Sequence, residues 1–247
     1  MKNIIISGIC GKTGTNVYES AKEAGLNVVC GIDKECYGNF DCPVYQSFAD
    51  VNEYADVVVD FSSPSNLIGL LNYCVGNKTP AVIATTGYSA DDETKIVEAA
   101  KVIPIMKTSN LSLGVNFFVK IVGETAKILG EYDVEIIERH HRYKKDAPSG
   151  TTKMIVEAIK KSREISLLSY GRKGEKPRKD GEIGIHSVRG GSVVGEHEVC
   201  FYGKYDEIRL VHSAQNKKLF SDGAIKAALF IAGQQPGFYT EKVLYNF

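Results

Sequence analysis

Five short apolar runs alternate with helix-forming segments over the first 107 residues of the 247-residue chain. The runs cover residues 3–7, 27–32, 56–61, 80–85 and 102–107, and helices are expected at 13–24, 65–76 and 90–101. Uninterrupted apolar strands are typical of sheets that are covered on both faces, and intervening helices provide that cover. This half is therefore predicted to form a parallel α/β sheet with helices on both sides.

The pattern changes after residue 110. A helix is predicted at 114–129, a half-buried strand at 132–139 and a helix that starts near Ser149. Beyond a charged, glycine-rich loop, three strands at 183–189, 196–203 and 206–213 are separated by turns, and a last helix covers about 217–233. Strands joined by turns indicate a mixed or antiparallel sheet. The second half is therefore predicted to be α+β, followed by a closing helix.

A glycine-rich turn, Gly8–Gly14, connects the first predicted strand to the first helix. Glycines permit a tight turn and close approach of the backbone to a pyrophosphate, and the helix N-terminus attracts negative charge. Asp33 follows the second strand 19 residues after Gly14, where a carboxylate can bind both hydroxyls of an adenosine ribose. Lys12 and Lys34 could instead contact a 2′-phosphate, so the pattern allows both NADH and NADPH. The alternative is an ordinary strand-to-helix turn that binds no nucleotide.

Two further loops follow predicted parallel strands, at residues 60–64 and 84–87. Ligands bind beyond the carboxyl ends of such strands. Small hydroxyl residues and glycine suit a loop that contacts ribose and nicotinamide, although the same residues also favour capped loops without a ligand.

The segment from Glu138 to Thr151 combines two histidines, a lysine and a Pro-Ser-Gly-Thr helix start. His140 and His141 are adjacent at a strand end, so they point to opposite sides and should have different roles. Lys144 adds a positive charge, and Ser149 is suited to cap a helix whose first amides can bind an anion. Together these residues predict a pocket for a small carboxylate beside a proton donor; the alternative is a basic surface loop.

Composition restricts the classes of protein that need considering. Thirty basic residues balance thirty acidic ones, which gives no indication of a nucleic-acid or membrane partner. The chain has no apolar window long enough to span a bilayer and no signal-peptide pattern, which favours a cytoplasmic location. The six cysteines lack metal-ligand spacing, so we expect free thiols and no metal.

The segment E-R-H-H-R-Y-K-K-D-A-P-S-G-T at 138–151 resembles the signature of the 4-hydroxy-tetrahydrodipicolinate (dihydrodipicolinate) reductase family. The resemblance extends over essentially the whole chain, with matching segments at 8–14, 60–64, 85–87, 109–116, 188–197 and 220–224. It implies an N-terminal Rossmann domain, residues 1–110 completed by 213–247, and an α+β substrate and oligomerisation domain with a mixed sheet, residues 111–212. It also implies a homotetramer.

The resemblance also implies roles for individual residues. His140 would be the acid/base residue and Lys144 a proton donor and carboxylate partner, while Arg189 would be a further substrate contact or a structural residue. The substrate, a small dicarboxylate, would be held by His141, Gly150 and Thr151. The dinucleotide would be lined by Gly8, Ile9, Cys10, Gly11, Lys12, Thr13, Asp33, Lys34, Ala84, Thr85, Thr86, Thr108, Ser109, Asn110 and Leu111. Ala84 and Leu111 depart from the residues usual in the family, Gly and Phe, which affects cofactor affinity more than the reaction.

The implied activity is NAD(P)H-dependent reduction of 4-hydroxy-tetrahydrodipicolinate to tetrahydrodipicolinate, in the diaminopimelate route of lysine biosynthesis. Two alternatives share the nucleotide-binding half. One is another two-domain amino-acid dehydrogenase, and the other is an NAD(P)-binding sensor without catalysis. Neither alternative accounts for the segment around His140.

Overall fold

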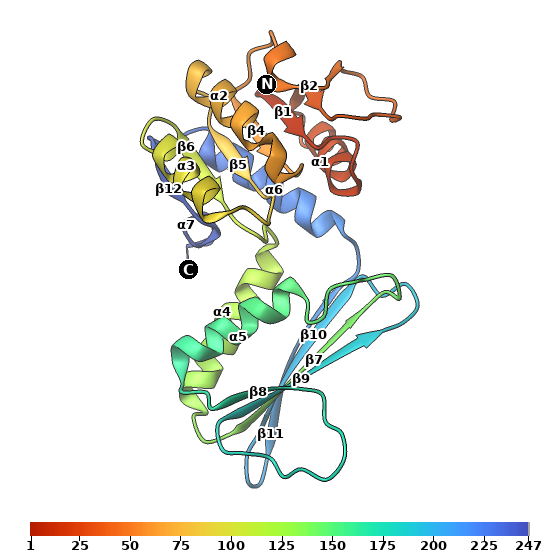
Figure 1. Ribbon diagram of the computed structural model, residues 1–247, viewed down its shortest axis with the longest axis vertical. Helices are drawn as coiled ribbons and strands as arrows, with labels where there is room; N and C mark the ends of the chain where they lie inside the picture. Colours follow the sequence, from red (N-terminus) through yellow and green to blue (C-terminus); the bar gives the residue numbers. More distant parts are fainter. Residues whose placement is uncertain (247) are drawn as a thin grey trace. The chain divides into compact units, whose positions relative to one another are not determined.

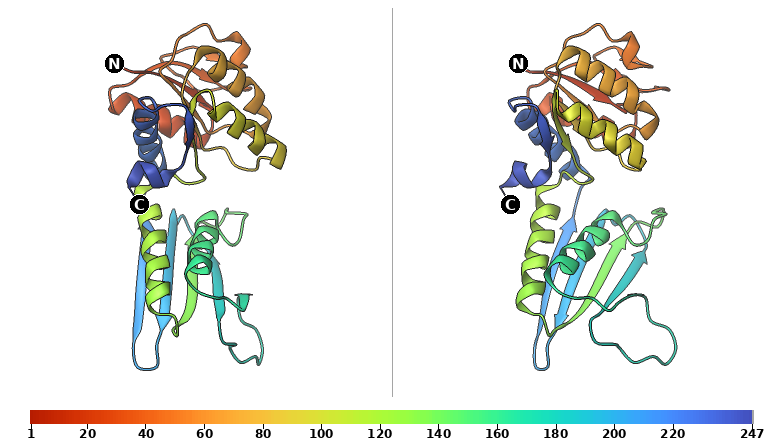
Figure 2. Two further views of the ribbon diagram at one scale, coloured as in Figure 1. Left: turned by 90° about the vertical axis from the view of Figure 1, so that its left-hand side faces the viewer. Right: turned by 60° about the vertical axis from the view of Figure 1, so that its left-hand side comes forward.

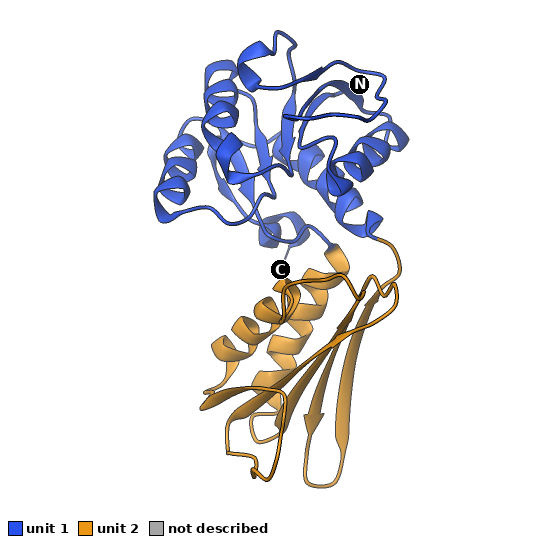
Figure 3. Ribbon diagram, turned by 45° about the vertical axis from the view of Figure 1, so that its right-hand side comes forward, with its two compact units in different colours: residues 1–112, 217–247 blue, residues 113–216 orange. Residues whose placement is uncertain are grey.

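The computed structural model describes residues 1–246, which form two compact units (Figure 3). Unit 1 contains Met1–Ser112 and the C-terminal stretch from Lys217, and unit 2 contains Leu113–Asn216. The first division lies two residues beyond the expected boundary at 110, and the second lies four residues beyond the expected boundary at 212. Each unit has its own sheet and its own core.

Unit 1, most of whose strands and helices are labelled in Figure 1, is built on a seven-stranded sheet. Its strand order is β12-β6-β5-β4-β1-β2-β3, and every pairing is parallel. This arrangement confirms the predicted Rossmann-like sheet. The strands are β1 (Asn3–Ser7), β2 (Asn27–Ile32), β3 (Val44–Tyr45), β4 (Val57–Asp60), β5 (Ala81–Ile83), β6 (Pro104–Lys107) and β12 (Gly237–Tyr239). The helices are α1 (Lys12–Glu23), α2 (Leu67–Asn77), α3 (Ala90–Ala100), α6 (Lys218–Ile231) and α7 (Glu241–Tyr245), with 3-10 turns at Phe48–Asp50 and Pro64–Asn66.

The sheet of unit 1 is buried on both faces because its strands carry apolar side chains on both sides. Ile5 and Val58 belong to a core that α2 and α3 cover, whereas Ile4 and Val59 belong to the core under α1 and α6. Successive side chains of a strand point to opposite faces, so an unbroken apolar run supplies both cores. Helix α6, from the later part of the chain, therefore covers one face of the N-terminal sheet.

Unit 2 contains a five-stranded mixed sheet with the order β11-β10-β7-β9-β8, as predicted. β10 pairs antiparallel with β7 and β11, whereas β9 pairs parallel with β7 and β8. The elements are α4 (Leu113–Ile128), β7 (Asp133–His140), α5 (Gly150–Ser162), β8 (Leu167–Tyr170), β9 (Glu182–Arg189), β10 (Gly195–Tyr202) and β11 (Glu207–Ala214).

Helices α4 and α5 lie side by side over one face of this sheet (Figure 2). Their apolar residues pack with Val134 and Ile136 of β7 and with Val199 and Phe201 of β10. The alternation of β7 places Glu138 and His140 on that same helix-covered face, where both are buried. Glu138 and His140 thus lie on the same face of β7 as the core residues Val134 and Ile136.

Several short elements were not predicted: β3, β8, β12 and α7. The strands have two to four residues and lie at or near the sheet edges, where pairing with a neighbour, and not local apolar pattern, defines them. Among residues 1–246, no helix is long and apolar enough to cross a membrane.

Candidate active site

The glycine-rich turn of unit 1 leaves no room for side chains where it meets α1. Gly8 has a φ of +80°, and a Cβ on Gly14 would lie 1.9 Å from the Gly8 carbonyl oxygen. Such contacts are possible only for glycine. The first turn of α1 can therefore lie directly against the loop, as a pyrophosphate-binding turn requires.

The residues around this turn fit a dinucleotide. Helix α1 has Gly11 as its N-cap, and no side chain within the described residues caps it, so its first amides are available to an anion. Asp33 follows β2 directly and accepts a hydrogen bond from the Cys10 backbone N–H, with N···Oδ2 at 3.0 Å. Beside the turn is a pocket of about 250 Å³ lined by Gly8, Gly11, Ile32, Asp33, Lys34, Phe61, Ser62, Ser63 and Asn66.

Cys10 and Cys36 form a disulfide with their Cα atoms 5.5 Å apart, so the expectation of six free thiols is wrong for this pair. The bond joins the glycine-rich turn to the segment that follows Asp33. Sequence spacing did not indicate it, because the two residues are 26 positions apart and are brought together by the pairing of β1 with β2. Cys30, Cys42, Cys74 and Cys200 are free, as expected.

The other expected dinucleotide residues lie in two loops of unit 1. Ala84, Thr85 and Thr86 follow β5, and Thr108–Leu111 follow β6. In a parallel sheet these loops share one edge with the glycine-rich turn after β1 and with Asp33 after β2. The Thr108 hydroxyl accepts a 3.1 Å hydrogen bond from the Asn110 N–H, and this bond stabilises the turn of the loop that follows β6.

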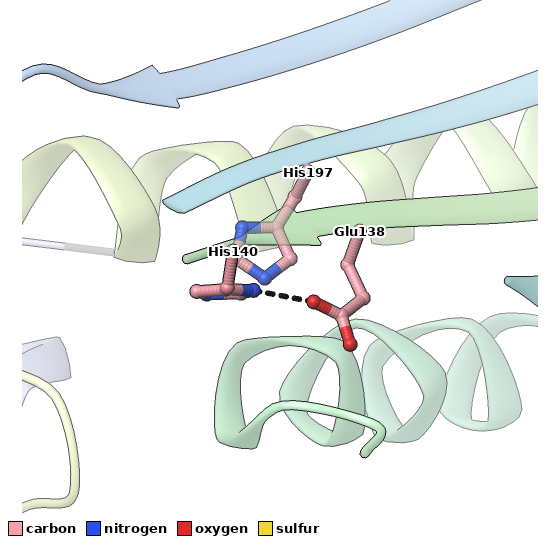
Figure 4. A group of neighbouring side chains, drawn as sticks. All are labelled: Glu138, His140 and His197. Carbon is pink, nitrogen blue, oxygen red and sulfur yellow. Dashed lines mark hydrogen bonds and ion pairs between the residues drawn. The ribbon is translucent and has the colours of Figure 1, made fainter. Parts of the chain in front are cut away.

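In unit 2, strand register brings together four polar residues at the end of the sheet. His197 of β10 lies directly opposite Glu138 of β7, and Arg189 of β9 lies beside His140. Both carboxylate oxygens of Glu138 bind the Arg189 guanidinium, at 2.7 and 2.9 Å, and Oε2 also contacts Nδ1 of His140. Figure 4 shows the Glu138–His140 contact with His197 beside it; the two imidazoles are edge-to-face, 5.2 Å between centroids.

Burial and charge set the protonation of this group. Burial lowers the pKa of His140, and Glu138 opposes that shift. Burial likewise lowers the pKa of His197, to about 4, with a further contribution from His140. Burial would raise the pKa of Glu138, but hydrogen bonds from Arg189 and other partners hold it below its usual value. At neutral pH the ionised Glu138 carboxylate therefore lies between the Arg189 guanidinium and the largely neutral imidazole of His140.

The remaining substrate-site candidates lie on the loop that follows β7 and at the start of α5. Ser149 caps α5, as predicted, and accepts from the Thr152 N–H. Gly150 and Thr151 then form the first turn of the helix, whose amides can bind a carboxylate. Lys144 forms an ion pair with Asp146, with Nζ 2.8 Å from Oδ1. His141 lies just beyond β7, and its Nδ1 is buried without a partner among the described residues.

Arg189 contacts two other segments of unit 2. Besides Glu138, its guanidinium binds the backbone carbonyl of Asp146 at 2.7 Å. It therefore connects β7 to the loop that carries Lys144. Of the two roles considered for Arg189, these contacts favour the structural one.

Glu138, His140 and His197 each place one potential metal-ligand atom within 4.8 Å of the others. Cysteine spacing could not reveal this cluster. Both oxygens of Glu138 are already engaged, and the adjacent guanidinium repels a cation. These contacts disfavour a metal ion at the cluster, and the expectation of no metal stays a prediction.

Glu138, Asp146 and His197 were not predicted as site residues from the sequence. Glu138 was detectable in principle, because residues two apart on a strand share a face and His140 was already a candidate. Asp146 lies inside the segment that carries the family resemblance. His197 is far along the chain, and only the β7–β10 pairing places it there.

His197 should make stability sensitive to mild acid. Its pKa of about 4 is below the ordinary 6.5, so between these values the unfolded chain binds a proton that the folded chain does not. The free energy of unfolding should therefore fall as pH drops, with His197 contributing about 2 kcal/mol between pH 7 and pH 5. Urea denaturation at pH 7 and at pH 5 should show that His197→Gln loses less free energy of unfolding between these values than the unmodified chain. Equal losses in the two proteins would contradict this assignment.

Two family models together match almost the whole chain. "Dihydrodipicolinate reductase, N-terminus" matches residues 2–111, and "Dihydrodipicolinate reductase, C-terminus" matches residues 114–244. The division between the two models falls close to the first boundary between the two units.

Similar proteins carry a consistent name. The 4-hydroxy-tetrahydrodipicolinate reductase of Caldanaerobacter subterraneus subsp. tengcongensis is 46% identical, over 97% of this chain and 96% of that protein. The reductase of Clostridium novyi is 42% identical with the same coverage. Among solved structures, dipicolinate-bound dihydrodipicolinate reductase from Paenisporosarcina sp. TG-14 superposes with a TM-score of 0.80 and 24% identity, covering 97% of each chain, which establishes a shared fold.

Proposed function

Because this chain belongs to the dihydrodipicolinate reductase family, we propose that it reduces 4-hydroxy-tetrahydrodipicolinate to tetrahydrodipicolinate with NADH or NADPH. The reaction belongs to the diaminopimelate route of lysine biosynthesis. Family membership and the NAD(P)-binding fold of unit 1 agree with each other.

The observation that carries the proposal is the set of groups at the end of the unit 2 sheet. A buried histidine, a lysine and a run of helix amides lie within one continuous segment, His140–Thr151. A dicarboxylate needs cationic and N–H partners, and a ring that is being reduced needs a proton donor. The solved relative from Paenisporosarcina was obtained with dipicolinate bound, a ligand of the same dicarboxylate class.

We assign the roles as follows. A nicotinamide held at unit 1 would supply the hydride, and the substrate carbon next to the reduced one would then receive a proton. His140 is the acid/base residue, because it is the buried imidazole of this segment and its Nδ1 contacts the Glu138 carboxylate, which can stabilise the protonated ring. Lys144 neutralises a carboxylate and assists in proton delivery. His141 and the amides of Gly150 and Thr151 hold the carboxylates.

The dinucleotide is proposed to contact the glycine-rich turn, Asp33, Lys34 and the loops after β5 and β6. The close packing of Gly8 on Gly14 supports the pyrophosphate position. Asp33 favours the ribose hydroxyls of NADH, while Lys34 and Lys12 permit a 2′-phosphate, so both cofactors are included in the proposal.

The direct test mixes purified chain with freshly prepared substrate and follows the absorbance of the reduced nicotinamide, with NADH and NADPH in separate reactions. Substrate-dependent loss of absorbance is expected with at least one of them. No loss with either would overturn the proposal. Turnover only on another amino-acid precursor would favour a different dehydrogenase, and dinucleotide binding without any turnover would favour a sensor.

A homotetramer in the cytoplasm is proposed as well. The sheet of unit 2 is covered by α4 and α5 on one face only, and exposed Val188 and Val211 lie on the opposite face. Such a face is suited to pack against another copy of the chain. Light scattering that gave a monomer mass would contradict this assembly.

A further inference from the structure

Glu138 is a carboxylate whose full burial needs an explanation. Its exposed fraction is 0%, and it lies at the polar end of an otherwise apolar strand face. Removing an ionised carboxylate from water costs several kcal/mol unless it is paired and hydrogen-bonded. The Arg189 guanidinium provides that pairing through two N–H donors at 2.7 and 2.9 Å.

The same carboxylate also binds His140. Its Oε2 accepts from Nδ1 of the imidazole, so the proton of the neutral ring is placed on Nδ1. The other ring nitrogen, Nε2, lies beside Gly195, where a Cβ would be only 3.1 Å away. One nitrogen is thus held by Glu138, while a glycine keeps space next to the other.

We propose that Glu138 is a positioning residue for His140, held in place by Arg189. It fixes the ring orientation and the tautomer, so that Nε2 is the nitrogen that carries the transferred proton. Its negative charge also stabilises the protonated ring. This inference rests on the proposed function, because the proton is the one that the reduction consumes.

Charges from every neighbouring element act on His140. Glu138 on its own strand raises its pKa, whereas Lys144 on the following loop and Arg189 on β9 lower it. His197 on β10 packs edge-to-face against the ring. Among these groups Glu138 alone is an anion in direct contact, so its removal should have a large and specific effect.

The decisive variant is Glu138→Gln, which keeps the shape and a carbonyl acceptor but removes the charge. The pKa of His140, measured by nitrogen-15 NMR of the imidazole, should fall by about one to three units. In a plot of kcat against pH, the decline of kcat on the alkaline side should shift to lower pH by the same number of pH units. We expect kcat at pH 8 to fall about 10-fold or more, with KM changed much less.

Glu182→Gln is the matched control. Glu182 is 3% exposed on β9 and pairs with Arg172 at 2.5 Å, so it is also a buried glutamate in a guanidinium pair within unit 2. Within the described residues its carboxylate accepts from Arg172 and from the Lys179 N–H, and not from His140. Its substitution should leave the pKa of His140 and the kcat profile unchanged.

Gly195→Ala and Glu138→Asp extend the test. The alanine methyl should lower kcat by crowding Nε2 while the pKa of His140 changes little. Glu138→Asp keeps the negative charge on a side chain that is shorter by one methylene, so the pKa of His140 should be higher in this variant than in Glu138→Gln. If the Glu138→Gln protein does not fold, Glu138→Asp takes its place in the test.

The outcomes separate this inference from the proposed function. An unchanged His140 pKa, tautomer and kcat profile in Glu138→Gln would overturn the positioning role, as would an equal kcat loss in Glu182→Gln. Absence of turnover by the unmodified chain with either nicotinamide would overturn the proposed function. In that case the imidazole spectra of the same proteins would still decide whether Glu138 controls His140.

Discussion

Replacing His140 with alanine is expected to lower kcat by about 100-fold or more, with the fold intact. The side chain is proposed to deliver the proton that completes the reduction, and alanine has no titratable group. The ring is 9% exposed and packs against His197, so its loss also leaves a small cavity, but at the end of the sheet and outside the apolar core. Steady-state kinetics together with circular dichroism would measure both effects.

Lys144→Ala should also lower turnover strongly, because it removes a cation that is proposed to pair with the substrate carboxylate. Its Nζ is held 2.8 Å from Asp146, so the charge is in a defined position before substrate binds. Lys145 is exposed and provides the matched control. Lys145→Ala should retain close to full turnover. Near-native kcat in either His140→Ala or Lys144→Ala would show that the corresponding role is wrong.

Gly14→Ala is expected to abolish dinucleotide binding and to destabilise unit 1. The new methyl carbon would lie 1.9 Å from the Gly8 carbonyl oxygen and 2.8 Å from the Ile9 Cα. These are backbone atoms, which cannot rotate away as a side chain can. Helix α1 must therefore shift off the turn, at a cost of about 3 kcal/mol for overpacking. Fluorescence titration with NADH and thermal unfolding would measure the two effects.

Gly76→Ala is the control for that substitution. Gly76 is exposed in α2, and an alanine methyl there would have open space around it, with no atom beyond the backbone of its own helix within 4 Å. Alanine should leave cofactor binding unchanged and raise stability by up to about 1 kcal/mol, since it favours helix. If Gly14→Ala bound NADH as tightly as Gly76→Ala, the close approach of α1 to the turn would not be needed for binding.

Much of the candidate site was predictable because its parts are local in sequence. The turn at Gly8–Gly14 needs only a strand, glycines and a helix start. Ser149 caps α5 within three residues of the amide it binds. The helix-covered face on which His140 lies follows from strand alternation. Each of these features depends on neighbours a few positions away.

The parts that were missed depend on distant segments. The Cys10–Cys36 bond required the β1–β2 pairing, and the short strands β3, β8 and β12 exist only because a longer neighbour pairs with them. His197 and Arg189 reach Glu138 through two different strand pairings, one antiparallel and one parallel. A periodic pattern indicates which face a residue takes, but not which strand lies beside it.

By itself, the amino-acid sequence determined the α/β class, the nucleotide-binding turn and the segment that carries His140 and Lys144. Only the tertiary structure decided how His140 is held. Glu138, the partner of its Nδ1, is two residues away and could have been predicted from the sequence. The Arg189 guanidinium, which pairs with the buried Glu138 carboxylate, is 51 residues from it along the chain. Burying a charge requires a counter-charge, and strand order determines which residue can supply it.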